Sequence, residues 1–152
     1  MDSNSNDFLP HRIFLADDDE DDQLLFNDVL KELSSSIELT VARDGEHLMK
    51  LLNNLTDLPD ILFLDLNMPL KNGFECLEEI KANKKFENLP IIIFSTSSQP
   101  SAVELVYQHG AHLYVRKPND FTNLKKIIHY VLSVNWRNNL LQPSKEKFVL
   151  TI

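Results

Sequence analysis

The chain has almost no cysteine, few basic residues and no long apolar segment. Its one cysteine, Cys76, excludes a disulfide framework and a zinc site built from several cysteines. Its apolar runs are far shorter than the ~20 residues that span a bilayer, and residues 1–7 are too polar for a secretory signal. Fifteen Lys and Arg against 23 Asp and Glu give a net charge of −8, which argues against a module that neutralises nucleic-acid phosphates. We expect a cytoplasmic protein that neither enters a membrane nor binds nucleic acid.

The acidic residues are concentrated near one end of the chain. Residues 1–22 hold eight acids and one base, a balance of −7, whereas residues 23–152 hold fifteen acids and fourteen bases, a balance of −1. Six of these acids are consecutive, at residues 17–22. Such a run fits either the solvated start of a helix, where carboxylates are favoured, or a site for a divalent cation or a phosphoryl group. For Asp19–Asp22 we prefer the solvated helix start.

Short apolar segments alternate with amphipathic helical segments along the chain. The apolar segments are typical of buried strands and lie at residues 12–16, 37–42, 61–64, 91–94 and 112–115. The helical segments between them repeat apolar residues at helical spacing; the clearest set is Leu48, Leu51, Leu52 and Leu55. Five alternations predict an α/β fold in which a parallel sheet carries helices on both faces.

The length of 152 residues and a hydrophobic content of 43% suit one domain. We expect that domain over residues 12–138, after a flexible N-terminus at residues 1–11. Residues 139–152 break the alternation and are interpreted as a tail, of which residues 148–150 could dock back onto the domain.

Polar residues follow four of the five predicted strands, and in a sheet of this kind ligands bind at the carboxyl ends of the strands. Three close carboxylates require a counter-charge, which Mg²⁺ supplies with few protein ligands. A carboxylate can also attack phosphorus, and the aspartyl phosphate that forms needs a cation and hydrogen-bond donors around it. The residues at these strand ends are Asp17, Asp18, Asp65, Ser95, Thr96 and Lys117.

The segments that carry these residues resemble the receiver domain of two-component response regulators, and the chain looks like a stand-alone member. The resemblance covers residues ~12–135 and implies a flavodoxin-like, doubly wound sheet of five parallel strands in the order 2-1-3-4-5. It rests on residues 13–19, 64–69 with Gly73 beyond, 93–96 and 114–118.

The resemblance also implies a role for each residue of the site. Asp65 would accept a phosphoryl group from a phosphohistidine on a sensor histidine kinase or a histidine phosphotransfer protein. Asp18 and Asp65 would ligate Mg²⁺ directly, Asp17 would act through water, and the backbone carbonyl of Asn67 would complete the protein ligands. Lys117 would pair with the phosphate.

Two further residues would form the switch that the resemblance implies. Ser95 would move to hydrogen-bond the new phosphate, and Tyr114 would turn inward as Ser95 moves. Pro118 would hold the turn after Lys117 through a cis bond. The chain would act as a regulator, not an enzyme beyond its own phosphorylation and slow dephosphorylation. Its output would be contact with an unidentified downstream protein through the face of the fourth helix, fifth strand and fifth helix, and homodimer formation stays open.

Three other functions are compared with this one. Asp17, Asp19 and Asp21 match the first positions of a calcium-binding EF-hand loop, but Asp22 and Asp28 stand where that loop requires Gly and Glu. A phosphatase with an Asp nucleophile would need a second acid two residues later, where this chain has Asn67. A receiver-like scaffold that binds proteins without phosphorylation stays as the alternative.

Overall fold

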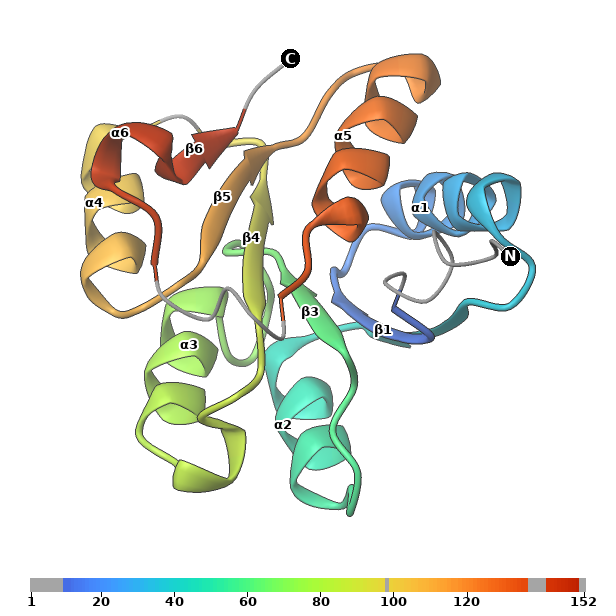
Figure 1. The fold of residues 1–152 in the computed structure, drawn as a ribbon. Helices are drawn as coiled ribbons and strands as arrows, with labels where there is room; N and C mark the ends of the chain where they lie inside the picture. Colours follow the sequence, from blue (N-terminus) through green and yellow to red (C-terminus); the bar gives the residue numbers. More distant parts are fainter. Residues whose placement is uncertain (1–9, 98, 137–141, 151–152) are drawn as a thin grey trace.

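Six parallel strands run side by side in the order β2-β1-β3-β4-β5-β6 (Figure 1). The structure is a computed structural model and describes residues 10–97, 99–136 and 142–150. The strands are β1 (Arg12–Ala16), β2 (Glu38–Ala42), β3 (Ile61–Leu64), β4 (Ile91–Ser95), β5 (Leu113–Arg116) and β6 (Val149–Leu150). The predicted doubly wound α/β fold with the order 2-1-3-4-5 is confirmed, and the short β6 extends it beside β5.

Helices cover both faces of this sheet, as Figure 1 shows. They are α1 (Glu20–Leu33), α2 (Gly45–Asn53), α3 (Gly73–Lys81), α4 (Pro100–Gln108), α5 (Phe121–Ser133) and the short α6 (Lys145–Phe148); a 3₁₀ turn, η2 (Lys84–Phe86), follows α3. None of the helices in the described ranges has the length and apolarity that a membrane crossing requires.

The strands separate two apolar clusters because successive side chains of a strand point to opposite faces. On one face, α1 and α5 pack on residues that include Ile13, Leu15, Ile61, Phe63, Ile92 and Phe94. On the other face, α2, α3 and α4 pack on residues that include Phe14, Leu62, Leu64, Ile91, Ile93 and Tyr114. The central strands are buried on both sides, which explains their continuous apolar sequences.

Short polar side chains cap four of the helices in the loops that follow the strands. The Asp19 carboxylate accepts a hydrogen bond from the Asp22 backbone N–H at 3.0 Å and caps α1. Asp44 and Asp120 cap α2 and α5 in the same way. Asn72 caps α3 in a reciprocal arrangement with Glu75. Because these caps fix where each helix begins, they also fix the loops that lie between the strand ends and the helices.

The end of the chain returns to the sheet. β6 pairs with β5 in parallel, with Val149 opposite Tyr114 and Leu150 opposite Val115, and Phe148 is fully buried. Residues 148–150 therefore do dock onto the domain. Three parts of these expectations lie outside the described residues. They are residues 1–9, most of the segment predicted to be flexible, residues 137–138 at the end of the predicted domain, and residues 139–141 and 151–152 of the predicted tail.

Candidate functional site

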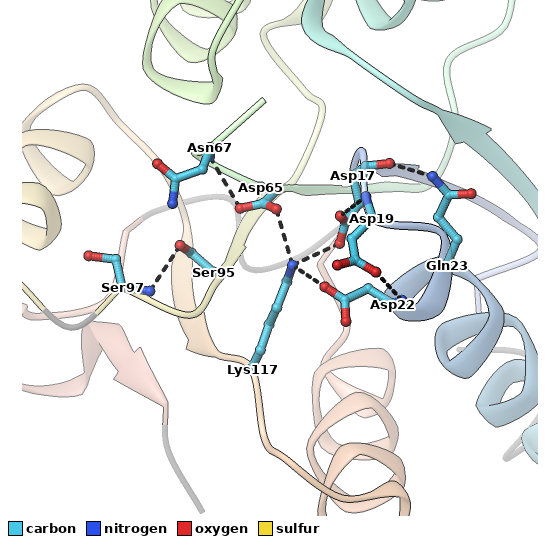
Figure 2. A network of polar contacts seen from close by, with 9 residues as sticks. All are labelled: Asp17, Asp19, Asp22, Gln23, Asp65, Asn67, Ser95, Ser97 and Lys117. Carbon is cyan, nitrogen blue, oxygen red and sulfur yellow. Dashed lines mark hydrogen bonds and ion pairs between the residues drawn. The ribbon is translucent and has the colours of Figure 1, made fainter. Parts of the chain in front are cut away.

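The carboxyl ends of β1, β3 and β5 bring three charged side chains into direct contact (Figure 2). The ammonium of Lys117 donates to Asp17 Oδ2 at 2.8 Å and to Asp65 Oδ2 at 3.1 Å. One hundred residues separate Lys117 from Asp17 in the sequence, so only the parallel sheet brings them together. The aliphatic part of Lys117 is covered, and its ammonium also lies 5.3 Å from the centre of the Phe94 ring.

Asp18 completes an acidic cluster with Asp17 and Asp65. One carboxylate oxygen of each residue lies within 4.8 Å of the other two. Asp17 and Asp65 are buried, whereas Asp18 is exposed to solvent. Oxygen ligands close together on a partly solvated edge are what Mg²⁺ requires, because this ion uses few protein ligands and keeps several waters. The donor set therefore fits a divalent hard cation.

Burial and charge act against each other on the ionisation of this cluster. Burial raises the pKa of Asp17 from 3.8 to about 6, although its hydrogen bond with Lys117 opposes the shift. Burial also raises the pKa of Asp65, again against the charge of Lys117. For Lys117, burial alone would lower the pKa, but the charge of Asp65 and the hydrogen bonds to Asp17 and Asp22 raise it overall. The ammonium thus stays protonated at neutral pH, and the ionised carboxylates outnumber it.

Asp22 is a site residue that the sequence interpretation missed. Its Oδ2 atom accepts a hydrogen bond of 2.7 Å from the Lys117 ammonium, whereas the acidic run Asp19–Asp22 was interpreted as a solvated helix start. That interpretation suits Asp19, the N-cap of α1. Asp22 lies in the first turn of α1, where the sequence offers several adjacent acids. No signal in the sequence distinguishes Asp22 from Glu20 and Asp21, because only the folded structure places one of them beside Lys117.

The neighbouring Gln23 holds the backbone at the end of β1. Its side-chain amide donates to the carbonyl oxygen of Asp17 at 2.6 Å (Figure 2). The backbone N–H of Asp19 donates to the Asp17 carboxylate at 3.0 Å. The first turn of α1 therefore orients both Asp17 and, through Asp22, the ammonium of Lys117.

Two serines lie on the other side of Asp65 from Asp17, as Figure 2 shows. Ser95, at the end of β4, is buried, and its hydroxyl oxygen accepts a hydrogen bond of 3.2 Å from the Ser97 backbone N–H. The Tyr114 hydroxyl donates to the Ser97 carbonyl at 2.8 Å. Tyr114 is fully buried, and its inward turn as Ser95 moves stays a prediction. Thr96, the other strand-end hydroxyl, is exposed.

Two turns around the site have definite backbone arrangements. The Asn67 backbone N–H donates to Asp65 Oδ1 at 3.3 Å, and the Lys117 backbone N–H donates to the Ser95 carbonyl at 2.9 Å. None of the peptide bonds in the described ranges is cis, so the predicted cis bond before Pro118 is wrong. A sequence cannot decide this, because trans is favoured over cis by only about 0.5–1 kcal/mol before proline.

Comparison with known proteins agrees with this geometry. The sequence pattern of the response regulator receiver domain matches residues 13–129. The chain belongs to this family. The response regulator Rcp1 of Synechocystis sp. (strain ATCC 27184 / PCC 6803 / Kazusa) is 30% identical to this receiver domain over 140 residues, which are 89% of this chain and 95% of Rcp1.

Solved structures of two response regulators share the fold. One is a crystal structure of the Mn²⁺-bound form of Rcp1. Its match spans 89% of this chain and 100% of the Rcp1 chain, with a TM-score of 0.75 and 30% sequence identity. The other is a crystal structure of the phosphorylated cyanobacterial phytochrome response regulator RcpA. Its match spans 80% of this chain and 90% of the RcpA chain, with a TM-score of 0.75 and 28% sequence identity. Receiver domains are in general signalling switches of two-component systems that bind Mg²⁺ and interact with histidine kinases or phosphotransfer proteins.

Proposed function

We propose that this receiver domain is a Mg²⁺-dependent phosphoryl acceptor whose acceptor residue is Asp65. The observation that carries the proposal is that the Asp65 carboxylate contacts the Lys117 ammonium at 3.1 Å and also belongs to the acidic cluster with Asp17 and Asp18. A carboxylate in this place lies beside one cation and within a set of ligands for a second. Both would offset the charge that a phosphoryl group brings.

In the proposed reaction, an oxygen of Asp65 attacks the phosphorus of a phosphohistidine on a kinase or phosphotransfer protein. The new O–P bond forms as the P–N bond breaks, and the electron pair of that bond stays on the imidazole nitrogen. Asp18 and Asp65 would hold Mg²⁺ directly, with Asp17 acting through water and the Asn67 carbonyl as a further ligand. The ion would supply positive charge beside the transferred phosphoryl oxygens.

The hydrogen bonds around Ser95 would connect phosphorylation of Asp65 with a change at the surface of the protein. A phosphate on Asp65 would attract the Lys117 ammonium and the Ser95 hydroxyl. The Ser95 hydroxyl oxygen now accepts a hydrogen bond from the Ser97 backbone N–H. This hydrogen bond would break if Ser95 moves toward the phosphate. Ser97 in turn holds the hydroxyl of Tyr114. Phosphorylation would thereby shift the equilibrium of the face formed by α4, β5 and α5.

This switch would act in the cytoplasm by contact with a downstream protein, without enzymatic turnover of any other substrate. The Mn²⁺-bound structure of Rcp1 and the phosphorylated structure of RcpA support the proposal, because a divalent ion and a phosphoryl group occur in those two relatives. The net charge of −8 supports a protein partner over a nucleic acid.

The proposal is tested by incubating the protein with acetyl phosphate and Mg²⁺ and measuring the intact mass. We expect the wild type to gain the mass of one phosphoryl group and Asp65→Asn to gain none, because an amide is no nucleophile toward phosphorus. Asp28→Asn, which removes an exposed carboxylate of α1, is the matched control and should label like the wild type. Equal labelling of wild type and Asp65→Asn would show that Asp65 is not the acceptor, and no labelling of either would favour the scaffold that acts without phosphorylation.

A further inference from the structure

The outer edge of β5 is covered by the chain's own C-terminal segment, which we define as residues 142–150. Without this segment β5 would end the sheet and present unpaired backbone groups, as edge strands do. β6 supplies the missing neighbour through the pairs Tyr114–Val149 and Val115–Leu150. Figure 1 shows α6 and β6 beside α4 and β5. The segment therefore lies on part of the face that the proposed switch would alter.

One aromatic ring anchors the C-terminal segment. The Phe148 side chain is fully buried, and its ring centre lies 4.9 Å from that of Tyr107 on α4 and 6.3 Å from that of Tyr114 on β5. Both contacts are edge-to-face, the arrangement that aromatic pairs prefer. Val149, by contrast, is partly exposed. Recognition by the backbone of an edge strand together with a pocket for one large side chain is the way in which many domains bind extended peptides.

Polar contacts fix the first half of the same segment on α4. The Gln142 amide donates to the carbonyl oxygens of Tyr107 and Ala111 at 2.6 and 2.7 Å, which lie in the last turn of α4 and just beyond it. The Tyr107 hydroxyl donates to the Pro143 carbonyl at 3.1 Å, and Lys145 forms an ion pair with Glu104 of α4. These contacts set the position of the segment along the helix, so that Phe148 meets the two tyrosines.

We propose that the α4–β5 edge is a docking surface for an extended peptide with an aromatic anchor, and that residues 142–150 occupy this surface within the same chain. The partner that fits is a protein segment with the same pattern as residues 145–150. This segment has a phenylalanine, two apolar residues directly after it and a basic residue three positions before it. Such a partner binds only after the chain's own segment leaves. This inference rests on the proposed output through the face of α4, β5 and α5 and adds that the chain's own segment covers part of it. None of its contacts requires Asp65 to be modified, so its test is separate from that of phosphorylation.

The test uses the full chain without phosphodonor and a fluorescent peptide of residues 142–150. We expect the peptide to bind the variant Phe148→Ala at least tenfold more tightly than the wild type in fluorescence anisotropy, because the variant's own segment loses its anchor. A peptide with alanine at the Phe148 position should bind neither protein. Leu30→Ala, which removes a comparable buried side chain of α1 on the other face of the sheet, is the control and should behave like the wild type.

A second variant keeps the test decisive if Phe148→Ala fails to fold. The double substitution Gln142→Ala and Lys145→Ala removes polar contacts of two side chains outside the core, and we expect several-fold faster amide hydrogen exchange at Val149 and Leu150. Lys125→Ala, which breaks the exposed ion pair with Glu32, should leave that exchange unchanged.

Three results would overturn the inference. They are equal peptide affinity for the wild type and Phe148→Ala, unchanged hydrogen exchange in the double variant, and a wild-type dimer in which residues 142–150 of one copy lie on β5 of the other.

Discussion

The site depends on the balance between the Lys117 ammonium and the carboxylates that it contacts. Asp17, Asp22 and Asp65 each accept a hydrogen bond from it, and Asp18 adds a fourth carboxylate within reach of a shared cation. With all of these groups ionised the cluster keeps an excess of negative charge. This excess is the physical reason to expect that the cluster binds a divalent cation.

Asp22→Asn should weaken Mg²⁺ binding a few-fold, on the order of 0.5–1 kcal/mol. The substitution removes one negative charge, and the ammonium then interacts more strongly with Asp17 and Asp65, the carboxylates that face the cation. Calorimetric titration with Mg²⁺ measures this change. Asp21→Asn removes the same charge from the same exposed turn, without a side-chain contact to Lys117 in the described structure. Equal losses in both variants would show that Asp22 has no specific role.

The raised pKa of Asp17 predicts a pH-dependent stability of the metal-free protein. Because the folded state binds the proton of Asp17 more tightly than the unfolded state, the stability contribution is largest below pH 3.8 and falls as the pH rises toward about 6. In EDTA, lowering the pH from 7 to 5 should therefore stabilise the wild type relative to Asp17→Asn by about 1 kcal/mol.

Urea unfolding of the wild type and Asp17→Asn at both pH values measures this difference. A difference that does not change with pH would mean that Asp17 ionises as easily in the folded protein as in the unfolded chain, and a change in the opposite direction would mean that it ionises more easily in the folded protein.

At the scale of single residues, the sequence predicted the charged groups that lie just beyond strand ends. Asp17, Asp65 and Lys117 follow apolar strands directly, so the topology alone brings them to one edge. Asp22 was not predicted, because its contact with Lys117 depends on where the first turn of α1 lies relative to the strand ends. The buried position of Tyr114 likewise depends on the ring of Phe148, which comes from a segment outside the alternating pattern.

At the scale of elements, the start of α3 supports the loop that carries Asp65. A Cβ atom on Gly73 would lie 2.2 Å from the Asp65 carbonyl oxygen and 2.7 Å from Leu66 Cα. The Gly73 backbone N–H donates to the Leu66 carbonyl at 3.0 Å. The helix can approach the loop this closely only because residue 73 has no side chain.

Gly73→Ala should therefore destabilise the protein by about 1–3 kcal/mol, although alanine favours helices, because the added methyl group meets backbone atoms that cannot rotate away. The same displacement would move Asp65 and slow its labelling by acetyl phosphate. Urea unfolding measures the stability, and Ser101→Ala in the exposed first turn of α4 is a helix control expected within ±0.5 kcal/mol of the wild type. A Gly73→Ala protein as stable as the wild type would contradict the close contact.

The elements themselves were predictable where periodicity is strong. The five long strands and their helices follow from apolar runs and helical spacing, with ends that differ by one residue: β5 covers Leu113–Arg116 where residues 112–115 were predicted. His112 instead uses its ring nitrogen Nδ1 to accept a hydrogen bond from the Ile91 backbone N–H. The sequence pattern did not predict β6. This strand has only two residues, too few for a periodic pattern, and it forms by pairing with β5, which is distant in the sequence.

At the scale of the whole molecule, the site exists only in the folded chain. Its residues come from the ends of four parallel strands and the first turn of α1, and up to one hundred residues separate the groups that touch. The same sheet carries the surface filled by residues 142–150 at its far edge. Tyr114 contacts both regions, through Ser97 on one side and Phe148 on the other. The fold and the family followed from the sequence, whereas this connection required the three-dimensional packing.

The most direct test of the central claim is to locate the phosphoryl group after reaction with acetyl phosphate and Mg²⁺. Borohydride reduces an acyl phosphate to an alcohol, so phosphorylated Asp65 would become homoserine, which peptide mass spectrometry assigns to one position. The account predicts homoserine at residue 65, and none in protein denatured before the phosphodonor is added. Homoserine at another carboxylate, or no homoserine in the folded protein, would contradict it.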